Sequence, residues 1–213
     1  MARPREFDRD EALVRARDAF WEHGYEGTSI ADLVAALDLA PARIYAAFGS
    51  KEELFREVVA LYEQQEGGFV TRALKEEPTA RGAIERMLRE AAETYTRRGR
   101  PRGCLVVSAA TSCAVENERV RQMLADLRLA QTSAIIERLK KAARDGELEL
   151  GADVQSLGDS FAALLHGLSV QARDGVPRER LLALCAVVVQ SLWPDARTGR
   201  KKRGNRPSAQ VAR

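Results

Sequence analysis

The stretch Asp38–Phe55, DLAPARIYAAFGSKEELF, decides how the first part of the chain folds. Pro41 suits the first position of a helix and Gly49 suits its end, so the sequence predicts a helix of barely two turns. Ile44 and Phe48 are four residues apart and are expected to face inward. The outward positions carry mostly alanines, which keep that surface slim enough for another molecule to approach closely.

Short helices are predicted on the N-terminal side of this stretch. Asp8 and Glu11 are spaced as a capping box for a helix over 9–23, which Gly24 ends. Thr28 is expected to cap a second helix that reaches residue 37. Asp38 follows in the tight turn before the third helix, and aspartate is one of the few residues besides glycine that tolerates a positive φ there.

The rest of the chain also has a helical pattern. Ser50 caps a longer helix that begins at Lys51, and further helices are expected over 79–98, 103–114, 117–145, 153–174 and 177–193. The run Cys104–Val107 fits a buried strand equally well, but nothing nearby alternates to pair with it, so we favour helix. The predicted fold class is therefore all-α, with a disordered basic tail after Pro194.

Composition and charge narrow the class of protein. The chain has 213 residues, of which 45% are hydrophobic, enough for one large domain or two small ones. The net charge of +3 comes from residues 195–213, which hold seven basic residues and one acid; the remainder has 27 basic and 30 acidic residues. Net charge alone thus does not indicate nucleic-acid binding, which must be argued from where individual basic groups point.

Several other classes are disfavoured. The charged N-terminus lacks the apolar core of a secretion signal, and the longest apolar run, 181–189, is too short to cross a bilayer, so we expect a cytoplasmic protein without a membrane partner. Three widely spaced cysteines indicate free thiols rather than a disulfide framework or a metal site. With two histidines and no nucleophile motif, an enzyme or a cofactor site is not expected.

The first three predicted helices match a helix-turn-helix unit. The second and third are separated by a turn of about three residues, and in such units the later helix lies in the major groove of DNA. A helix whose inner face needs only Ile44 and Phe48, and whose outer face is mostly alanine, suits that role. A surface for docking protein only, as in a helical adaptor, remains the alternative.

Longer pieces of sequence resemble a known family. Thr28–Ile30, Arg43–Phe48 and Gly49–Phe55 resemble the N-terminal DNA-binding domain of TetR/AcrR-type transcriptional regulators. Gly103–Val107 and Gln171–Gly175 resemble one subgroup of C-terminal domains in that family. The resemblance implies a DNA-binding domain over 1–50, a helical effector-binding and dimerisation domain over 51–193 and a basic tail over 194–213. It also implies a homodimeric repressor, released from a near-palindromic double-stranded DNA operator by a small-molecule effector.

The same resemblance implies which residues contact DNA. It puts backbone contacts at Thr28, Tyr45 and Lys51 and base reading at Pro41, Ala42, Arg43 and Ala46. The chemistry agrees, because Lys51 stands at a helix N-terminus that favours phosphate and Arg43 has the donors to identify a guanine. Pairing of Arg43 with Asp38 or Asp32, and packing of Tyr45 against the fourth helix, are the alternatives.

Two positions depart from the family pattern. Asp38 stands where members often carry glycine and adds negative charge near the DNA, and Ala47 replaces a His or Tyr that often contacts phosphate. Arg3, Arg5 and Arg9 are candidates for compensation as an N-terminal arm, with a disordered terminus as the alternative. The basic tail after Pro194 is either attracted to DNA by its charge or is a solvated, disordered end.

The sequence identifies the dimer face and the effector pocket less clearly than the DNA-binding helix. The resemblance places the dimer face on the last two long helices, where apolar stripes include Leu157, Phe161, Leu164, Leu165, Leu168, Leu182, Val188, Val189 and Leu192. Candidate pocket residues are Leu88, Tyr95, Cys104, Leu105, Met123, Leu127 and His166, each of which fits equally well as core. A thiol- or metal-responsive regulator that senses through Cys104 is the alternative, and a buried, inert cysteine opposes it. The effector, the operator and the sign of regulation stay open.

Overall fold

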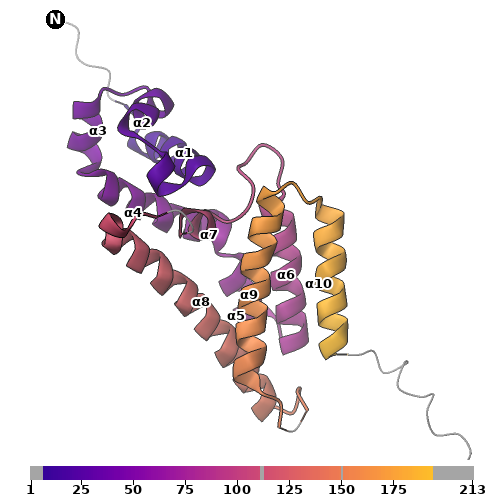
Figure 1. The fold of residues 1–213 in the computed structure, drawn as a ribbon. Helices are drawn as coiled ribbons and strands as arrows, with labels where there is room; N and C mark the ends of the chain where they lie inside the picture. Colours follow the sequence, from indigo (N-terminus) through magenta and orange to yellow (C-terminus); the bar gives the residue numbers. More distant parts are fainter. Residues whose placement is uncertain (1–6, 111–112, 150, 194–213) are drawn as a thin grey trace, which may run out of the picture.

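The computed structural model describes residues 7–110, 113–149 and 151–193 (Figure 1). Every regular element of these residues is helical, which confirms the all-α class, and the ambiguous run after Cys104 is helix. The predicted tail over 194–213 lies outside the described residues. The helices are α1 (Arg9–Gly27), α2 (Ile30–Leu37), α3 (Pro41–Phe48), α4 (Lys51–Tyr62), α5 (Phe69–Glu76), α6 (Ala80–Tyr95), α7 (Leu105–Ala110), α8 (Glu118–Arg144), α9 (Val154–Arg173) and α10 (Arg178–Leu192).

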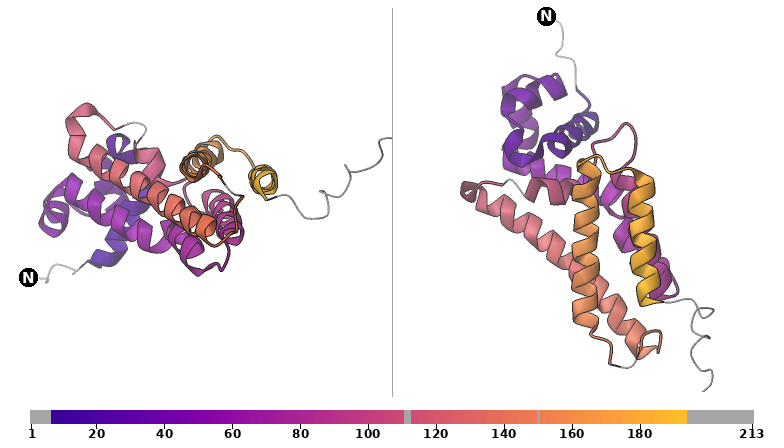
Figure 2. Two further views of the ribbon diagram at one scale, coloured as in Figure 1. Left: turned by 90° about the horizontal axis from the view of Figure 1, so that it is seen from below. Right: turned by 45° about the vertical axis from the view of Figure 1, so that its right-hand side comes forward.

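The helices form two groups that share one core. Helices α1 to α4 gather at one end of the molecule with α3 on the outside, while α6, α9 and α10 run side by side at the other end (Figure 1). The long α8 runs obliquely from the α4 end to the lower end of α9 and packs against α9, while α10 packs against α6 at the outer edge (Figure 2). This arrangement places α3 far from α10.

Local chemistry explains the first two helices and corrects two predictions. The Asp8 carboxylate accepts from the backbone N–H groups of residues 10 and 11, as expected of a cap. Gly24, with φ 75°, kinks α1 instead of ending it, and one further turn continues to Gly27. The cap of α2 is Ser29, not Thr28, because Thr28 is buried and donates its hydroxyl to the Gly24 carbonyl at 2.7 Å.

The turn between α2 and α3 follows the sequence prediction. Asp38 adopts φ 56° in the left-handed region, and Pro41 opens α3. Gly49, with φ 76°, closes α3, and the capping box of Ser50 with Glu53 starts α4 at once. The short helix is therefore fixed at both ends by local chemistry.

Residues 63–76 differ from the prediction, which placed no separate helix there. A π-helix over Glu63–Gly67 follows α4 directly, and α5 begins after Gly68. The two adjacent glycines separate the apolar patterns of α4 and α5. Of the helix predicted over 103–114, the structure describes α7 over Leu105–Ala110, while Cys113 and Ala114 are not helical and residues 111–112 lie outside the described residues. A single 3-10 turn over Val115–Asn117 leads into α8.

A buried junction joins the two groups of helices. Trp21 of α1 is fully buried, lies edge-on to Tyr62 with ring centroids 4.9 Å apart, and donates its indole N–H to the Gly103 carbonyl at 3.1 Å. Arg173 at the end of α9 donates to the carbonyls of Trp21 at 3.1 Å and Glu22 at 2.8 Å. We call these contacts, with the Ser169 hydroxyl that accepts from the Cys104 N–H at 2.8 Å, the α1–α9 junction.

No residue other than glycine fits at position 103 of this junction. Its φ is +80°, and a Cβ added there would lie 2.8 Å from both the Ser169 carbonyl oxygen and the Arg173 Cγ. The glycine is needed for backbone conformation and for close approach at the same time.

We expect Gly103→Ala to lower the free energy of unfolding by about 2–4 kcal/mol. The cost of a left-handed conformation for alanine and the cost of the overlap with Ser169 are added together. Gly99→Ala is the matched control, since Gly99 has φ +75° but nothing within 4 Å of an added Cβ, and it should cost only about 1 kcal/mol. Denaturant unfolding of both variants measures the difference. Equal losses would show that close approach at Gly103 is unimportant.

Candidate DNA interface and effector site

The outer face of α3 carries the predicted base-reading residues. Ile44 and Phe48 hold the helix to the core with 2% and 4% of their surface exposed. Figure 1 shows α3 at the outer edge of the first group of helices. The residues predicted to read bases all lie on its exposed side: Pro41, Ala42, Arg43 and Ala46.

Arg43 stands among acidic side chains. It lines a surface hollow beside the start of α1 together with Asp38, Glu11 and Arg15. Three carboxylates line this hollow, of Asp8, Glu11 and Asp38, and they oppose an approaching phosphate backbone, as the sequence indicated for Asp38. The attraction to DNA must therefore come from specific arginine and lysine contacts.

The two residues predicted to contact the DNA backbone beside Arg43 are Tyr45, on α3, and Lys51, the first residue of α4. Tyr45 is 46% exposed, so its ring is not enclosed against α4. The Lys51 ammonium, at the start of α4, lies 4.4 Å from the centre of the Tyr25 ring. Burial lowers the pKa of Lys51, and the nearby Glu26 carboxylate acts in the opposite direction. Lys51 is thus held in a fixed position at a helix N-terminus.

Two predicted contributions to the interface need correction. Thr28 is fully buried with its hydroxyl bonded to Gly24, so its side chain is not presented to phosphate; the neighbouring Ser29 is exposed at the α2 N-terminus instead. Arg9 does not reach outward as part of an arm. Its guanidinium lies 4.5 Å from the Phe48 ring centre and bonds both Glu57 carboxylate oxygens at 2.7 and 2.8 Å. Arg3 and Arg5 lie outside the described residues.

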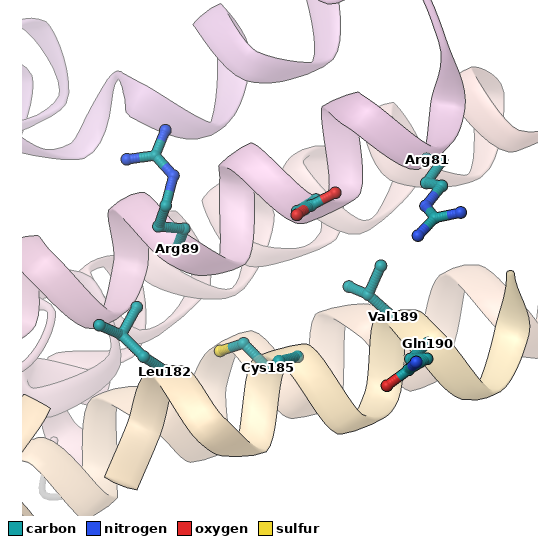
Figure 3. Close-up of a pocket in the computed structure, with 8 residues that line it drawn as sticks. Arg81, Arg89, Leu182, Cys185, Val189 and Gln190 are labelled. Carbon is teal, nitrogen blue, oxygen red and sulfur yellow. The ribbon is translucent and has the colours of Figure 1, made fainter. Parts of the chain in front are cut away.

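The candidate effector residues do not form one site. Leu88 and Leu105 are fully buried in the core, whereas Met123 and Leu127 line a surface pocket beside Arg56 of α4. A separate groove runs between α6 and α10 (Figure 3). It is lined by Arg81, Glu85, Arg89, Leu182, Cys185, Ala186, Val189 and Gln190, none of which was a pocket candidate.

The remaining candidates lie near Cys104, together with residues that the sequence did not single out. Burial raises the pKa of the Cys104 thiol although the Tyr62 hydroxyl favours the thiolate. Cys104 is thus the buried thiol that the sequence analysis set against a sensor, because a raised pKa keeps it protonated at neutral pH. Tyr95, Glu63 and Arg128 also act electrostatically on this region. The signal for Arg128 was its position four residues after Leu124, on the inner stripe of α8.

Within residues 7–110, 113–149 and 151–193, no group of three or more His, Cys, Asp or Glu side chains is placed to hold a metal ion. Cys113 is half-exposed, and burial together with Glu26 raises its pKa. The same part of the chain has no helix of the length and apolarity needed to cross a bilayer.

The predicted dimer stripes are partly internal. Phe161, Leu165, Leu168 and Val189 have at most 4% of their surface exposed and belong to the core of a single chain. The outward stripes consist of smaller residues at heptad-like spacing. They are Ser156, Ser160, Ala163, Gly167 and Val170 on α9, and Ala183, Val187 and Gln190 on α10.

Comparison with known proteins agrees with this architecture. The model of bacterial regulatory proteins of the tetR family matches residues 12–58, and that of a tetracyclin repressor-like C-terminal domain matches residues 79–178. The repressor ComR of Escherichia coli K12 is 30% identical over 194 residues, which cover 91% of this chain and 92% of ComR. The chain belongs to the tetR family. This is a family of DNA-binding transcriptional regulators and not of enzymes.

Further members support the assignment. The E. coli K12 repressor BdcR is 27% identical, with coverage of 89% of this chain and 91% of BdcR. A cysteine-substituted CifR, a TetR-family regulator solved with 26 bp double-strand operator DNA, superposes with a TM-score of 0.84 at 44% identity, covering 90% of this chain and 100% of CifR.

The left-handed conformation of Asp38 gives a test of the turn before α3. We expect Asp38→Asn to leave the free energy of unfolding within about 0.5 kcal/mol of wild type, because asparagine tolerates positive φ equally well. Asp38→Ala should lower it by about 1 kcal/mol. Thermal and denaturant unfolding check the pair, and equal stabilities would show that φ at this position carries no cost.

Proposed function

We propose that this chain is a cytoplasmic, homodimeric repressor that binds a near-palindromic operator through α3 and leaves it when a small-molecule effector binds. The observation that supports this most is the exposed outer face of α3, which combines three small residues with one arginine at the edge of the molecule. Residues 1–50 would bind DNA, residues 51–193 would bind the effector and the second subunit, and 194–213 would form an appended basic tail.

The recognition chemistry follows from the side chains of α3. Arg43 donates two hydrogen bonds to the acceptors of a guanine, and the Ala42 methyl contacts a thymine methyl. Lys51 and Tyr45 bind phosphates on either side and fix the register of the helix in the groove. Because phosphate contacts supply much of the affinity, binding should weaken steeply as salt increases.

The relatives support repression and operator binding. ComR and BdcR are transcriptional repressors by name, and CifR was solved on its operator. The similarity to ComR and to CifR spans both the α3 region and the C-terminal helices, since it covers 91% and 90% of this chain. We infer the same mode of action for this protein.

Dimerisation would use the outward stripes of α9 and α10. Val170 is 46% exposed and Val187 is 66% exposed, and a side chain added at Gly167 would meet nothing within 4 Å. Small and apolar residues on two adjacent antiparallel helices allow close packing against the same two helices of a second copy around a two-fold axis. A two-fold dimer presents two α3 helices to successive major grooves, roughly 34–36 Å apart.

We expect Arg43→Ala to weaken binding to the selected operator by about 5- to 150-fold, which corresponds to about 1–3 kcal/mol for a bidentate base contact. Lys140→Ala is the control, because Lys140 is an exposed cation on α8 far from α3 and its removal changes the net charge equally. Fluorescence anisotropy with an operator found by binding-site selection gives both values. Unchanged affinity of a folded, dimeric Arg43→Ala variant would contradict the assignment of α3.

We expect Val187→Glu to convert the dimer to monomers, because it places two carboxylates in a desolvated interface. Light scattering after size exclusion measures the mass, and operator affinity should fall with it. Val115→Glu is the control, since Val115 is 71% exposed and lies outside α9 and α10. A dimer that tolerates glutamate at position 187 would place the interface elsewhere.

A further inference from the structure

The interior of the C-terminal bundle contains polar groups that the described chain does not satisfy. Tyr62 at the end of α4 is fully buried, and its hydroxyl has no hydrogen-bond partner among the described residues. The same holds for Nη1 of Arg128 on α8 and Nε2 of His166 on α9. Buried polar groups almost always have partners, so three such atoms in one region require an explanation.

Tyr62 and Arg128 lie near Cys104, and His166 lies near Arg128. The hydroxyls of Tyr62 and Tyr95 lie beside its thiol, and the guanidinium of Arg128 is close enough to interact with it electrostatically. Arg128 acts in turn on His166. We call this set, which comes from five different parts of the chain, the inner polar cluster: Tyr62, Glu63, Tyr95, Cys104, Arg128 and His166.

Glu63 adds a carboxyl group to the cluster. It begins the π-helix, a widened turn that is frequent at functional sites. Its carboxyl group folds back over the backbone, since a Cβ added to Gly67 would lie 2.5 Å from the Glu63 Oε1. Burial raises the pKa of Glu63 above its ordinary value. Glu63 and the two tyrosines thus bring a carboxyl group and two hydroxyl groups into the cluster.

Arg128 is the cation of the cluster. Arg128 forms no ion pair with any residue in 7–110, 113–149 or 151–193, although one of its nitrogens is fully buried. Burial, and then the charge of Arg128, lower the pKa of His166, which leaves its ring neutral. A partly buried guanidinium with a free N–H is best satisfied by an anion, and a planar carboxylate matches its geometry.

We propose that the inner polar cluster binds the effector, and that the effector is a small organic carboxylate with a hydroxyl or carbonyl group at its other end. The carboxylate accepts hydrogen bonds from Arg128 Nη1 and from His166 when Nε2 carries the proton. The hydroxyl or carbonyl group bonds to Tyr62 and Glu63. The proposal rests on the proposed function, which requires an effector, and adds its site and its chemical class.

The position of the cluster suits regulation. Cys104 forms part of the cluster wall, and its backbone N–H bonds to Ser169 in the α1–α9 junction. Gly103, the preceding residue, accepts the hydrogen bond from Trp21 of α1 through its carbonyl. A ligand that moves the Cys104 segment therefore acts directly on the contacts that set α1, and with it α3, against α9 and α10.

The first experiment uses two carboxylates and their uncharged amides as probes: 4-hydroxybenzoate with 4-hydroxybenzamide, and 3-hydroxybutyrate with 3-hydroxybutyramide. Thermal unfolding of the full chain measures binding, and operator anisotropy measures release. We expect at least one carboxylate to raise the melting temperature and release the operator, whereas its amide does neither. Absence of any carboxylate effect, or an equal effect of the amides, would overturn the proposal.

The second experiment removes the cation. Without ligand, Arg128→Met should raise the melting temperature by about 2–4 °C, because an unpaired buried charge is replaced by an apolar chain of similar length. It should also abolish the carboxylate-dependent shift while operator affinity stays within about twofold. Arg144→Met, at the exposed end of the same helix, is the control and should change neither property.

A lower melting temperature for Arg128→Met would mean that Arg128 has a structural partner, and this would overturn the proposal. Tyr62→Phe provides an independent variant, since removal of an unpartnered hydroxyl preserves the core and should weaken the carboxylate shift without lowering stability. Operator binding by the wild type is scored separately: its failure would count against the proposed function, whereas the carboxylate shift is measured without DNA.

Discussion

The arrangement of the molecule depends on how Arg173 completes the kinked end of α1. The carbonyls of Trp21 and Glu22 lie just before Gly24, where the kink removes their helical partners, and the guanidinium of Arg173 donates to both. Arg173 is the last residue of α9, so a single side chain fixes the end of one group of helices against the end of the other. Any change in the direction of α9 must be transmitted to α1 or must break these bonds.

This connection explains why two separate parts of the sequence resemble the same family subgroup. The segment that begins at Gly103 and the segment around Arg173 are some 70 residues apart in the chain, yet Arg173 also bonds to the Arg102 carbonyl and its Cγ occupies the space that a Gly103 side chain would need. The position of the Arg173 side chain therefore requires a glycine at position 103. The two motifs are two halves of one contact, which lies on the path between the C-terminal bundle and α3.

The sequence predicts what local chemistry decides. Proline, glycine and the capping residues fix the ends of α3, and the positive φ of Asp38 follows from the tightness of its turn. Thr28 and Ser29 show the limit of this reasoning, because both are good caps and only the packing of Thr28 under α1 decides between them. Arg9 is similar: an arginine at the start of a helix suggests an arm, and only the fold brings Glu57 and Phe48 to it.

The candidate site in the bundle was harder to predict for a related reason. A helical pattern assigns residues to faces but does not state which faces meet, so His166 fitted core as well as a pocket and nothing singled out Arg128. Once α4, α8 and α9 converge, these side chains become polar groups in an apolar interior, where each weakens the folded state. Under the proposed function such groups would suit a regulator, because a ligand that satisfies them in only one conformation of the C-terminal bundle would favour that conformation by the difference in its affinity for the two.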